Sequence, residues 1–284
     1  MEKSFDIVLP EELKRGFLPR PIESDKHSVG TVTIVGGSGH YIHAPVIAGL
    51  GARAAGAGLV QLVVPDASRI AAGALVPEAT FTKLVATCVP PRADVTVIGM
   101  GLGVSVSSEV LVSRLLSGSK GRFVIDADAL AILASWYGER SGYAPVDGQE
   151  LILTPHAGEA AKLLGCTRAD IAADRDVAAF EIARRYGATV VLKGAETIVI
   201  NPEGDRKYVN KTGNPFMAMG GMGDLLSGAI GARWAYLKGD AFTAASSTVW
   251  LHASASDMVV RSFNDPSIVN TASSLGSLRV KLDS

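Results

Sequence analysis

Residues 31–39 read Thr-Val-Thr-Ile-Val-Gly-Gly-Ser-Gly, a β-branched apolar run that stops at a cluster of glycines. This pattern is typical of a buried strand and of the turn that follows it. The same order returns at residues 93–103, where Ala-Asp-Val-Thr-Val-Ile precedes Gly-Met-Gly-Leu-Gly. Strands that read as continuous apolar runs are typical of a parallel sheet covered on both faces, so they favour an α/β fold.

Apolar runs and helical periodicity extend this pattern along the chain. Further strands are expected at residues 59–64, 122–125, 151–153, 189–192, 197–200 and 207–209, the last two as a hairpin. Helices are expected at residues 44–58, 107–116, 129–135, 159–164, 174–186, 223–237 and 242–261. The alternation predicts a three-layer α/β/α domain with a mostly parallel central sheet. Residues 1–28 are expected to form an N-terminal arm, and residues 29–284 a single domain.

The composition argues against several functional classes. Of 284 residues, 48% are hydrophobic, so a substantial core is expected, and a formal net charge of −1 offers no basic surface for nucleic acid. Cys88 and Cys166 form no CxxC pair, which argues against disulfides or zinc and favours the cytoplasm. Residues 44–65 are apolar, but their prolines and glycines favour a buried helix and strand over a membrane span. We therefore expect a soluble cytoplasmic protein without a nucleic-acid or membrane partner.

The loop Gly-Gly-Met-Gly-Asp at residues 220–224 is the strongest functional signal. It precedes an expected helix, whose first backbone N–H groups are free to bind a phosphoryl group. Asp224 either complements the helix dipole or is the general base that takes a proton from an attacking hydroxyl group. The adjacent glycines favour the interpretation of Asp224 as the general base. Three methionines are expected to pack against this loop, namely Met217, Met219 and Met222.

Polar residues follow other expected strands, and each has two interpretations. His156 contacts a polar substrate, or it is an incidental surface residue in a helix-capping turn. Lys193 contacts nucleotide phosphates, or it is a solvated turn residue. Asp126 and Asp128 hold Mg²⁺ through water, or Asp128 caps the next helix; we favour the cap for Asp128 and leave Asp126 open. The histidines at 40, 43 and 252 have no spacing typical of a metal site, and no residue is assigned as a metal ligand.

Three motifs together resemble those of the ADP/ATP-dependent NAD(P)H-hydrate dehydratases, in the ribokinase-like superfamily, and they lie at residues 153–159, 191–194 and 220–228. The resemblance covers the chain from about Val29 to about Arg261. It implies a ribokinase-like catalytic domain that dehydrates the S-form hydrate of NADH or NADPH with ADP or ATP. In such enzymes a nucleotide phosphorylates the hydroxyl group of the hydrate, and loss of phosphate restores the nicotinamide double bond.

The resemblance also implies a role for particular residues. Asp224 would be the catalytic base and would contact the substrate. The other substrate-binding residues would be Ala44, Gly103 and His156. The nucleotide-binding residues would be Lys193, Gly194, Ala195, Glu196, Thr197, Gly221 and Gly223. Mg²⁺ is the expected cofactor, because phosphoryl transfer from a nucleotide generally needs its charge.

The sequence departs from the family's usual residues at Met100 and Ala157, where proline is usual, and at Met222, where Thr or Ser is usual. Two other functions therefore stay open. One is a kinase of the same superfamily for a vitamin precursor or sugar-like molecule, and the other is a catalytically weak nucleotide-binding regulatory protein. Because residues 1–28 are too short for an epimerase domain, the expected functional partner is an NAD(P)H-hydrate epimerase on a separate chain. The alanine-rich C-terminal helices could pack internally or form a homo-oligomer.

Overall fold

A nine-stranded sheet forms the centre of the computed structural model, which describes residues 7–117, 120–139, 145–262 and 264–284. The strands are β1 (Thr31–Val35), β2 (Leu59–Val64), β3 (Thr80–Lys83), β4 (Val95–Ile98), β5 (Gly121–Ile125), β6 (Gln149–Leu153), β7 (Thr189–Leu192), β8 (Thr197–Ile200) and β9 (Lys207–Asn210). Their order is β3-β2-β1-β4-β5-β6-β7-β8-β9. β1 to β7 are parallel, and β8 pairs antiparallel with both β7 and β9. The expected mostly parallel sheet and the expected hairpin, formed by β8 and β9, are confirmed.

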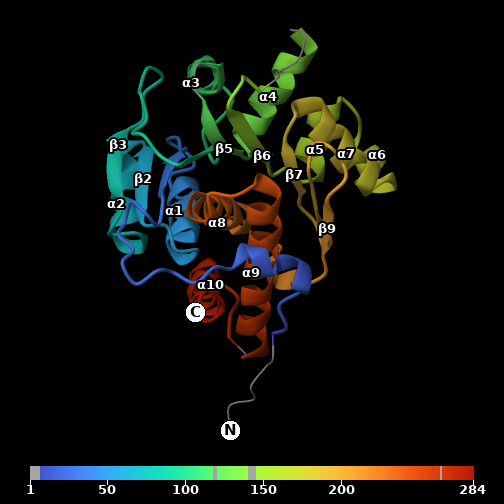
Figure 1. Cartoon of the computed structure of the whole chain (residues 1–284). Helices are drawn as coiled ribbons and strands as arrows, with labels where there is room; N and C mark the ends of the chain where they lie inside the picture. Colours follow the sequence, from blue (N-terminus) through green and yellow to red (C-terminus); the bar gives the residue numbers. More distant parts are fainter. Residues whose placement is uncertain (1–6, 118–119, 140–144, 263) are drawn as a thin grey trace.

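Helices cover both faces of this sheet (Figure 1). They are η1 (Glu11–Gly16), α1 (Ala44–Ala54), α2 (Asp66–Leu75), α3 (Val106–Ser117), α4 (Asp128–Glu139), α5 (Ala157–Leu164), α6 (Arg168–Ala173), α7 (Arg175–Tyr186), η2 (Pro215–Met217), α8 (Met222–Leu237), α9 (Ala241–Arg261) and α10 (Ile268–Leu282). α1, α2, α8, α9 and α10 pack on one face, and α3 to α7 pack on the other. The predicted three-layer α/β/α arrangement is confirmed.

Each central strand divides its side chains between the two helical layers. In β1, Val32 and Ile34 belong to the core on the side of α1 and α8, whereas Val35 belongs to the core on the opposite side. In β6, Ile152 and Leu153 are divided in the same way. Successive side chains of a strand point to opposite faces, so a sheet covered on both faces needs apolar residues at every position.

Two glycines bring α1 and α8 into backbone contact where the helices cross. A Cβ atom at Gly51 would overlap the carbonyl oxygen of Leu225, and a Cβ atom at Gly228 would overlap that of Ala48. Glycine is needed here because any side chain would push the two helices apart. This close crossing fixes the first turns of α8 relative to α1.

The expected N-terminal arm is in part packed against the helical layer. η1 contacts α9, and Leu13 and Phe17 are buried in the core. From α8, Arg233 donates hydrogen bonds to the carbonyl oxygen of Gly16 and to both carboxylate oxygens of Asp283, the latter at 2.6 and 2.9 Å. α8 is therefore tied to residues near both ends of the chain.

Several elements lie outside the expectations from sequence, namely η1, α2, β3, α6, η2 and α10. β3 is a four-residue edge strand with mostly exposed side chains, so no apolar run marks it. α10 is rich in Ser, Thr and Gly, which have low helix propensity, and it is held by buried residues such as Leu275. The helix expected at residues 44–58 ends at Ala54, shortly before Gly56 adopts a φ of +93°. None of the helices described combines the length and the apolarity needed to cross a membrane.

Candidate functional site

Loops that follow parallel strands meet at one edge of the sheet. The four clusters expected at strand ends follow β1, β4, β6 and β7, at residues 36–39, 99–103, 154–159 and 193–194. Neighbouring loops are joined by backbone hydrogen bonds, such as the one from the Lys193 N–H to the Pro155 carbonyl oxygen at 2.8 Å. The carboxyl edge of the strands is where ligands bind in open α/β sheets.

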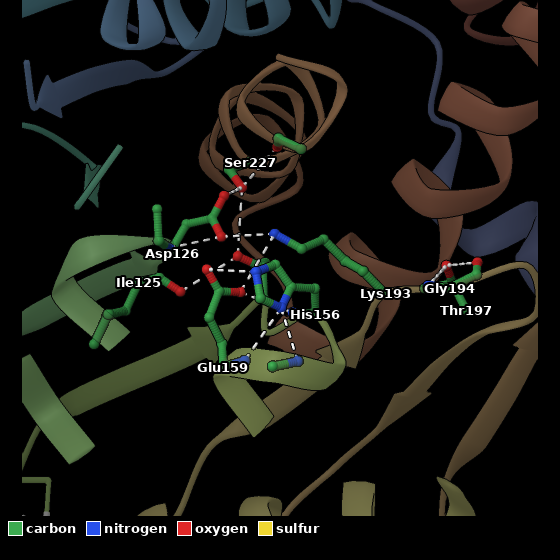
Figure 2. Close-up of polar contacts among 12 residues, drawn as sticks. Ile125, Asp126, His156, Glu159, Lys193, Gly194, Thr197 and Ser227 are labelled. Atoms are coloured by element: carbon green, nitrogen blue, oxygen red, sulfur yellow. Dashed lines mark hydrogen bonds and ion pairs between the residues drawn. The ribbon is translucent and has the colours of Figure 1, made fainter. Parts of the chain in front are cut away.

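A buried carboxylate, Asp126, lies at the centre of this edge. It follows β5 and is 1% exposed. One oxygen accepts a hydrogen bond from Nζ of Lys193 at 2.8 Å, and the other accepts one from Oγ of Ser227 at 2.5 Å (Figure 2). Burial acts to lower the pKa of Lys193, but the carboxylates of Asp126 and Glu159 outweigh it and raise that pKa. The alternative in which Lys193 is a solvated turn residue is wrong.

His156 is the N-cap of α5. Its Nδ1 accepts hydrogen bonds from the backbone N–H groups of Gly158 and Glu159, at 2.9 and 3.1 Å. The carboxylate of Glu159 accepts one from the His156 N–H at 2.8 Å, which completes a capping box (Figure 2). Because Nδ1 is an acceptor, the neutral ring carries its proton on Nε2. The turn is a helix cap, and histidine itself supplies the capping atom.

Asp128 lies at the start of α4 but does not act as its cap. It is the first helical residue, and its Oδ2 accepts a hydrogen bond from the backbone N–H of Gly103 at 2.8 Å. The capping role favoured from the sequence is wrong, because the carboxylate is directed to the glycine turn after β4. Asp128 thereby fixes Gly103, one of the predicted substrate-binding residues.

The glycine-rich loop enters α8 as the sequence predicts. Gly221 precedes the helix with a φ of +95°, a conformation that favours glycine. The first N–H groups of a helix have no intrahelical partner and carry the positive end of its dipole. A Cβ atom at Gly223 would lie 3.2 Å from Nζ of Lys193, so the ammonium group is next to this helix end. Together they form an environment suited to a phosphoryl group.

Asp224 is the partly buried acid in the first turn of α8. Among the residues the structure describes, none donates a hydrogen bond to its carboxylate. Burial raises the pKa of Asp224 to about 7, the carboxylate of Asp126 adds to the effect, and Lys193 opposes it. An acid with a pKa near neutrality can take up and release a proton at physiological pH. Complementing the helix dipole would not by itself raise this pKa, since a positive potential stabilises the ionised form.

A cavity of about 830 Å³ opens beside the start of α8. Its wall includes His156 after β6, the residues around the ends of β7 and β9, the loop that leads to α8 with the first turns of that helix, and one face of α9. The predicted site residues that line it are His156, Lys193, Gly194, Ala195, Thr197 and Gly223. Those outside its lining, all within the described ranges, are Ala44, Gly103, Glu196, Gly221 and Asp224. Met217, Met219 and Met222 also line the cavity, next to the loop against which they are expected to pack.

Two polar residues of this region are absent from the sequence-based expectations. Ser227 donates to Asp126, and its position four residues after Gly223 places it on the same helix face, a spacing that could have identified it. Arg175 of α7 donates hydrogen bonds to the carbonyl oxygens of Leu192 and Glu196, at 3.1 and 3.2 Å, and so holds the loop between β7 and β8. No local sequence pattern predicts bonds of this kind.

Comparison with known proteins identifies the family. A family model described as NAD(P)H-hydrate dehydratase matches residues 32–274. The ADP-dependent (S)-NAD(P)H-hydrate dehydratase of Neisseria meningitidis is 38% identical over 250 residues, which cover 87% of this chain and 82% of that protein. The bifunctional NAD(P)H-hydrate repair enzyme of Gloeobacter violaceus is 36% identical over 276 residues, 90% of this chain. The chain spans 50% of the length of that bifunctional relative.

A solved structure gives the same result. The ADP/ATP-dependent NAD(P)H-hydrate dehydratase of Bacillus subtilis, co-crystallised with ATP and Mg²⁺, is 28% identical with a TM-score of 0.84. The match covers 97% of this chain and 98% of that one. The ribokinase-like fold predicted from the sequence is confirmed. The chain belongs to the NAD(P)H-hydrate dehydratase family.

Proposed function

We propose that this protein dehydrates the S-form hydrate of NADH or NADPH at the expense of ADP or ATP. The observation that carries the proposal is the position of Asp224, an acid with a pKa near 7, at a helix end that Lys193 makes electropositive. The names of the relatives support the proposal, since one is an ADP-dependent and another an ADP/ATP-dependent dehydratase of this substrate.

The proposed reaction has two steps. Asp224 takes the proton of the hydrate's hydroxyl group while the oxygen of that hydroxyl group attacks the terminal phosphorus of the nucleotide. The nucleotide, now one phosphate shorter, leaves. The phosphate then leaves the ring carbon with the electrons of the C–O bond. The neighbouring carbon loses a proton to water, and the electrons of that C–H bond restore the double bond. Phosphorylation is needed because hydroxide is a poor leaving group and phosphate is a good one.

The proposed binding residues divide into two groups. For the nucleotide, Lys193 and the N–H groups around Gly221 and Gly223 would hold the phosphates, and the loop of residues 194–197 would border the pocket. For the hydrate, Ala44, Gly103 and His156 would form the contacts. Five of the seven proposed nucleotide residues line one cavity, which supports this assignment.

Mg²⁺ is the proposed cofactor. Asp126 and Asp128 would hold it through water, and carboxylate oxygens are ligands that Mg²⁺ prefers. Within the described parts of the chain, no three His, Cys, Asp or Glu side chains are close enough to hold a metal ion together. This fits a Mg²⁺ that takes most of its ligands from phosphate and water, as is usual at nucleotide sites. The ion would supply positive charge to the phosphates.

The wider setting of the enzyme is also a proposal. Residues 29–284 would form one catalytic domain, with residues 1–28 as an arm. The enzyme would act in the cytoplasm beside an NAD(P)H-hydrate epimerase. The bifunctional repair enzymes among the relatives support such a link between two repair activities.

The test is incubation of the purified protein with hydrated NADH, Mg²⁺ and either ADP or ATP. Recovery of NADH absorbance with an equal amount of released phosphate is the expected result. Transfer of phosphate to a vitamin-like alcohol, without recovery of NADH, would instead identify a kinase. Nucleotide binding without turnover of either substrate would identify a regulatory protein.

A further inference from the structure

His252 lies on α9, and with Val249 and Ala253 it forms one helical face that lines the cavity of about 830 Å³. The imidazole is 4% exposed. Its Nε2 atom is buried without a hydrogen-bond partner, and no described residue bonds to Nδ1. A buried polar group without a partner is unfavourable and rare, so this ring has hydrogen-bonding capacity that a ligand can use.

The other polar side chains of the cavity wall already have partners within the protein. Hydrogen bonds occupy the side chains of His156, Lys193, Thr197, Asn210, Thr212 and Asn214. Asn210 and Thr212, for example, bond to each other at 2.9 Å. In the described part of this wall, His252 is the polar side chain that lacks a partner.

The chemical state of His252 limits what it can bind. Burial lowers the pKa of the imidazole to about 4, so the ring is neutral near pH 7. A neutral imidazole has one N–H donor and one nitrogen acceptor. It is therefore a poor partner for a phosphate group, which needs cations or several donors, and it can form one hydrogen bond with a polar atom of a heterocycle.

The position of His252 separates it from the phosphate-binding end of the cavity. The ammonium group of Lys193 points toward Asp126, at the end of β5. α9 packs over β6 to β9, and the part of it next to His252 borders the loop after β9, since a Cβ atom at Gly213 would lie 3.5 Å from Cβ of Ala253. β9 lies on the other side of β7 from β5 (Figure 1). Next to His252 the wall is apolar, with Val249 and Ala253, and such a surface suits the flat face of a base.

We infer that His252 recognises the base of the bound nucleotide through a hydrogen bond to the edge of a purine. Adenine presents an amino donor and ring-nitrogen acceptors on its edge, and either kind of group can form one hydrogen bond with a neutral imidazole. The inference rests on the proposed function, since it takes the phosphates of ADP or ATP to lie at the start of α8. It makes His252 a specificity-determining residue for the nucleotide.

The experiment compares the wild type with His252→Leu by calorimetric titration. Two probes are used with Mg²⁺, namely ATP and inorganic tripolyphosphate, which has the phosphates without the base. Ser254→Ala is the matched control, because Ser254 is also a buried polar residue of α9 without a partner but does not line the cavity. Thermal unfolding of each variant without nucleotide reports on the fold.

His252→Leu should bind ATP about tenfold more weakly, since it loses one hydrogen bond, and should bind tripolyphosphate as the wild type does. It should unfold at the same or a higher temperature, because an unpaired buried ring has been removed. Ser254→Ala should bind ATP normally, and His252→Asn, which keeps a donor and an acceptor, should recover part of the affinity.

Two results would overturn the inference while leaving the proposed function intact. One is normal ATP affinity in His252→Leu, and the other is an equal loss of affinity for ATP and tripolyphosphate, which would mean that His252 shapes the phosphate site. A wild-type protein that binds tripolyphosphate and ATP equally well would also exclude base recognition. Failure of the wild type to bind either ATP or ADP would remove the proposed function and the inference with it.

Discussion

The ammonium group of Lys193 lies 2.8 Å from Oδ1 of Asp126, and this ion pair joins the end of β7 to the end of β5 across the intervening β6. Asp126 is 1% exposed and also accepts the hydroxyl hydrogen bond of Ser227 on α8. Two strands and one helix are thus tied at a single carboxylate. The pair holds a cation beside the helix end at which the phosphates of a nucleotide would lie.

Lys193→Met should weaken both the fold and nucleotide binding. The change leaves the Asp126 carboxylate buried without its cation, which should lower the free energy of unfolding by about 3–5 kcal/mol. Urea unfolding and ADP titration measure the two effects. Lys162→Met, at an exposed position of α5, is the control and should change neither. In the double variant Lys193→Met/Asp126→Asn, the free energy of unfolding should partly return, but the ADP affinity should not. Wild-type ADP affinity in either variant would exclude phosphate binding by Lys193.

The pH dependence of turnover should report the ionisation of Asp224. Its pKa is raised to about 7, chiefly by burial, and a general base acts only when ionised. Values of kcat/KM should therefore rise about tenfold per pH unit below neutrality and level off above about pH 7. A rate that stays constant between about pH 5 and 8 would show that no such base is needed.

Asp224→Asn should stabilise the protein in alkaline solution. Folding raises the pKa of this acid from 3.8 to about 7, so its contribution to stability is complete below pH 3.8 and is lost as the pH rises through about 7. At about pH 8 the variant should exceed the wild type by roughly 2–4 kcal/mol in the free energy of unfolding, and at about pH 4 the two should agree. Equal stability of the two proteins in alkaline urea would contradict the buried environment of Asp224.

Arg233→Met should destabilise the fold far from the proposed chemistry. Arg233 is 1% exposed, and its loss leaves the carboxylate of Asp283 buried, at a cost of about 3–5 kcal/mol. Arg53→Met breaks the exposed pair with Glu78 and should cost less than about 1 kcal/mol, so it is the matched control. Thermal unfolding measures the stability of both variants. A similar decrease in Tm for the two would count against an anchoring role for Arg233.

Much of the fold follows from the sequence because β-branched and apolar residues fill the central strands, as in Thr31–Val35 and Thr189–Leu192, where every position is buried. The exposed edge strand β3 gives no such signal. The sequence also places the functional clusters at strand ends, since the glycines there interrupt apolar runs. It does not show that Lys193 pairs with Asp126, because two residues 67 positions apart meet only through the order of the strands. The lack of a hydrogen-bond partner for Nε2 of His252 is likewise not visible in the sequence, because it depends on which face of α9 borders the cavity.

In the proposed mechanism, Asp224 deprotonates the hydrate while the amino end of α8 holds the phosphates. The decisive experiment measures two properties of Asp224→Asn, namely its affinity for ADP or ATP and the rate at which it restores NADH from the hydrate. The variant should bind nucleotide nearly as tightly as the wild type and restore NADH about 10²–10⁴ times more slowly. Restoration of NADH at close to the wild-type rate would contradict this mechanism.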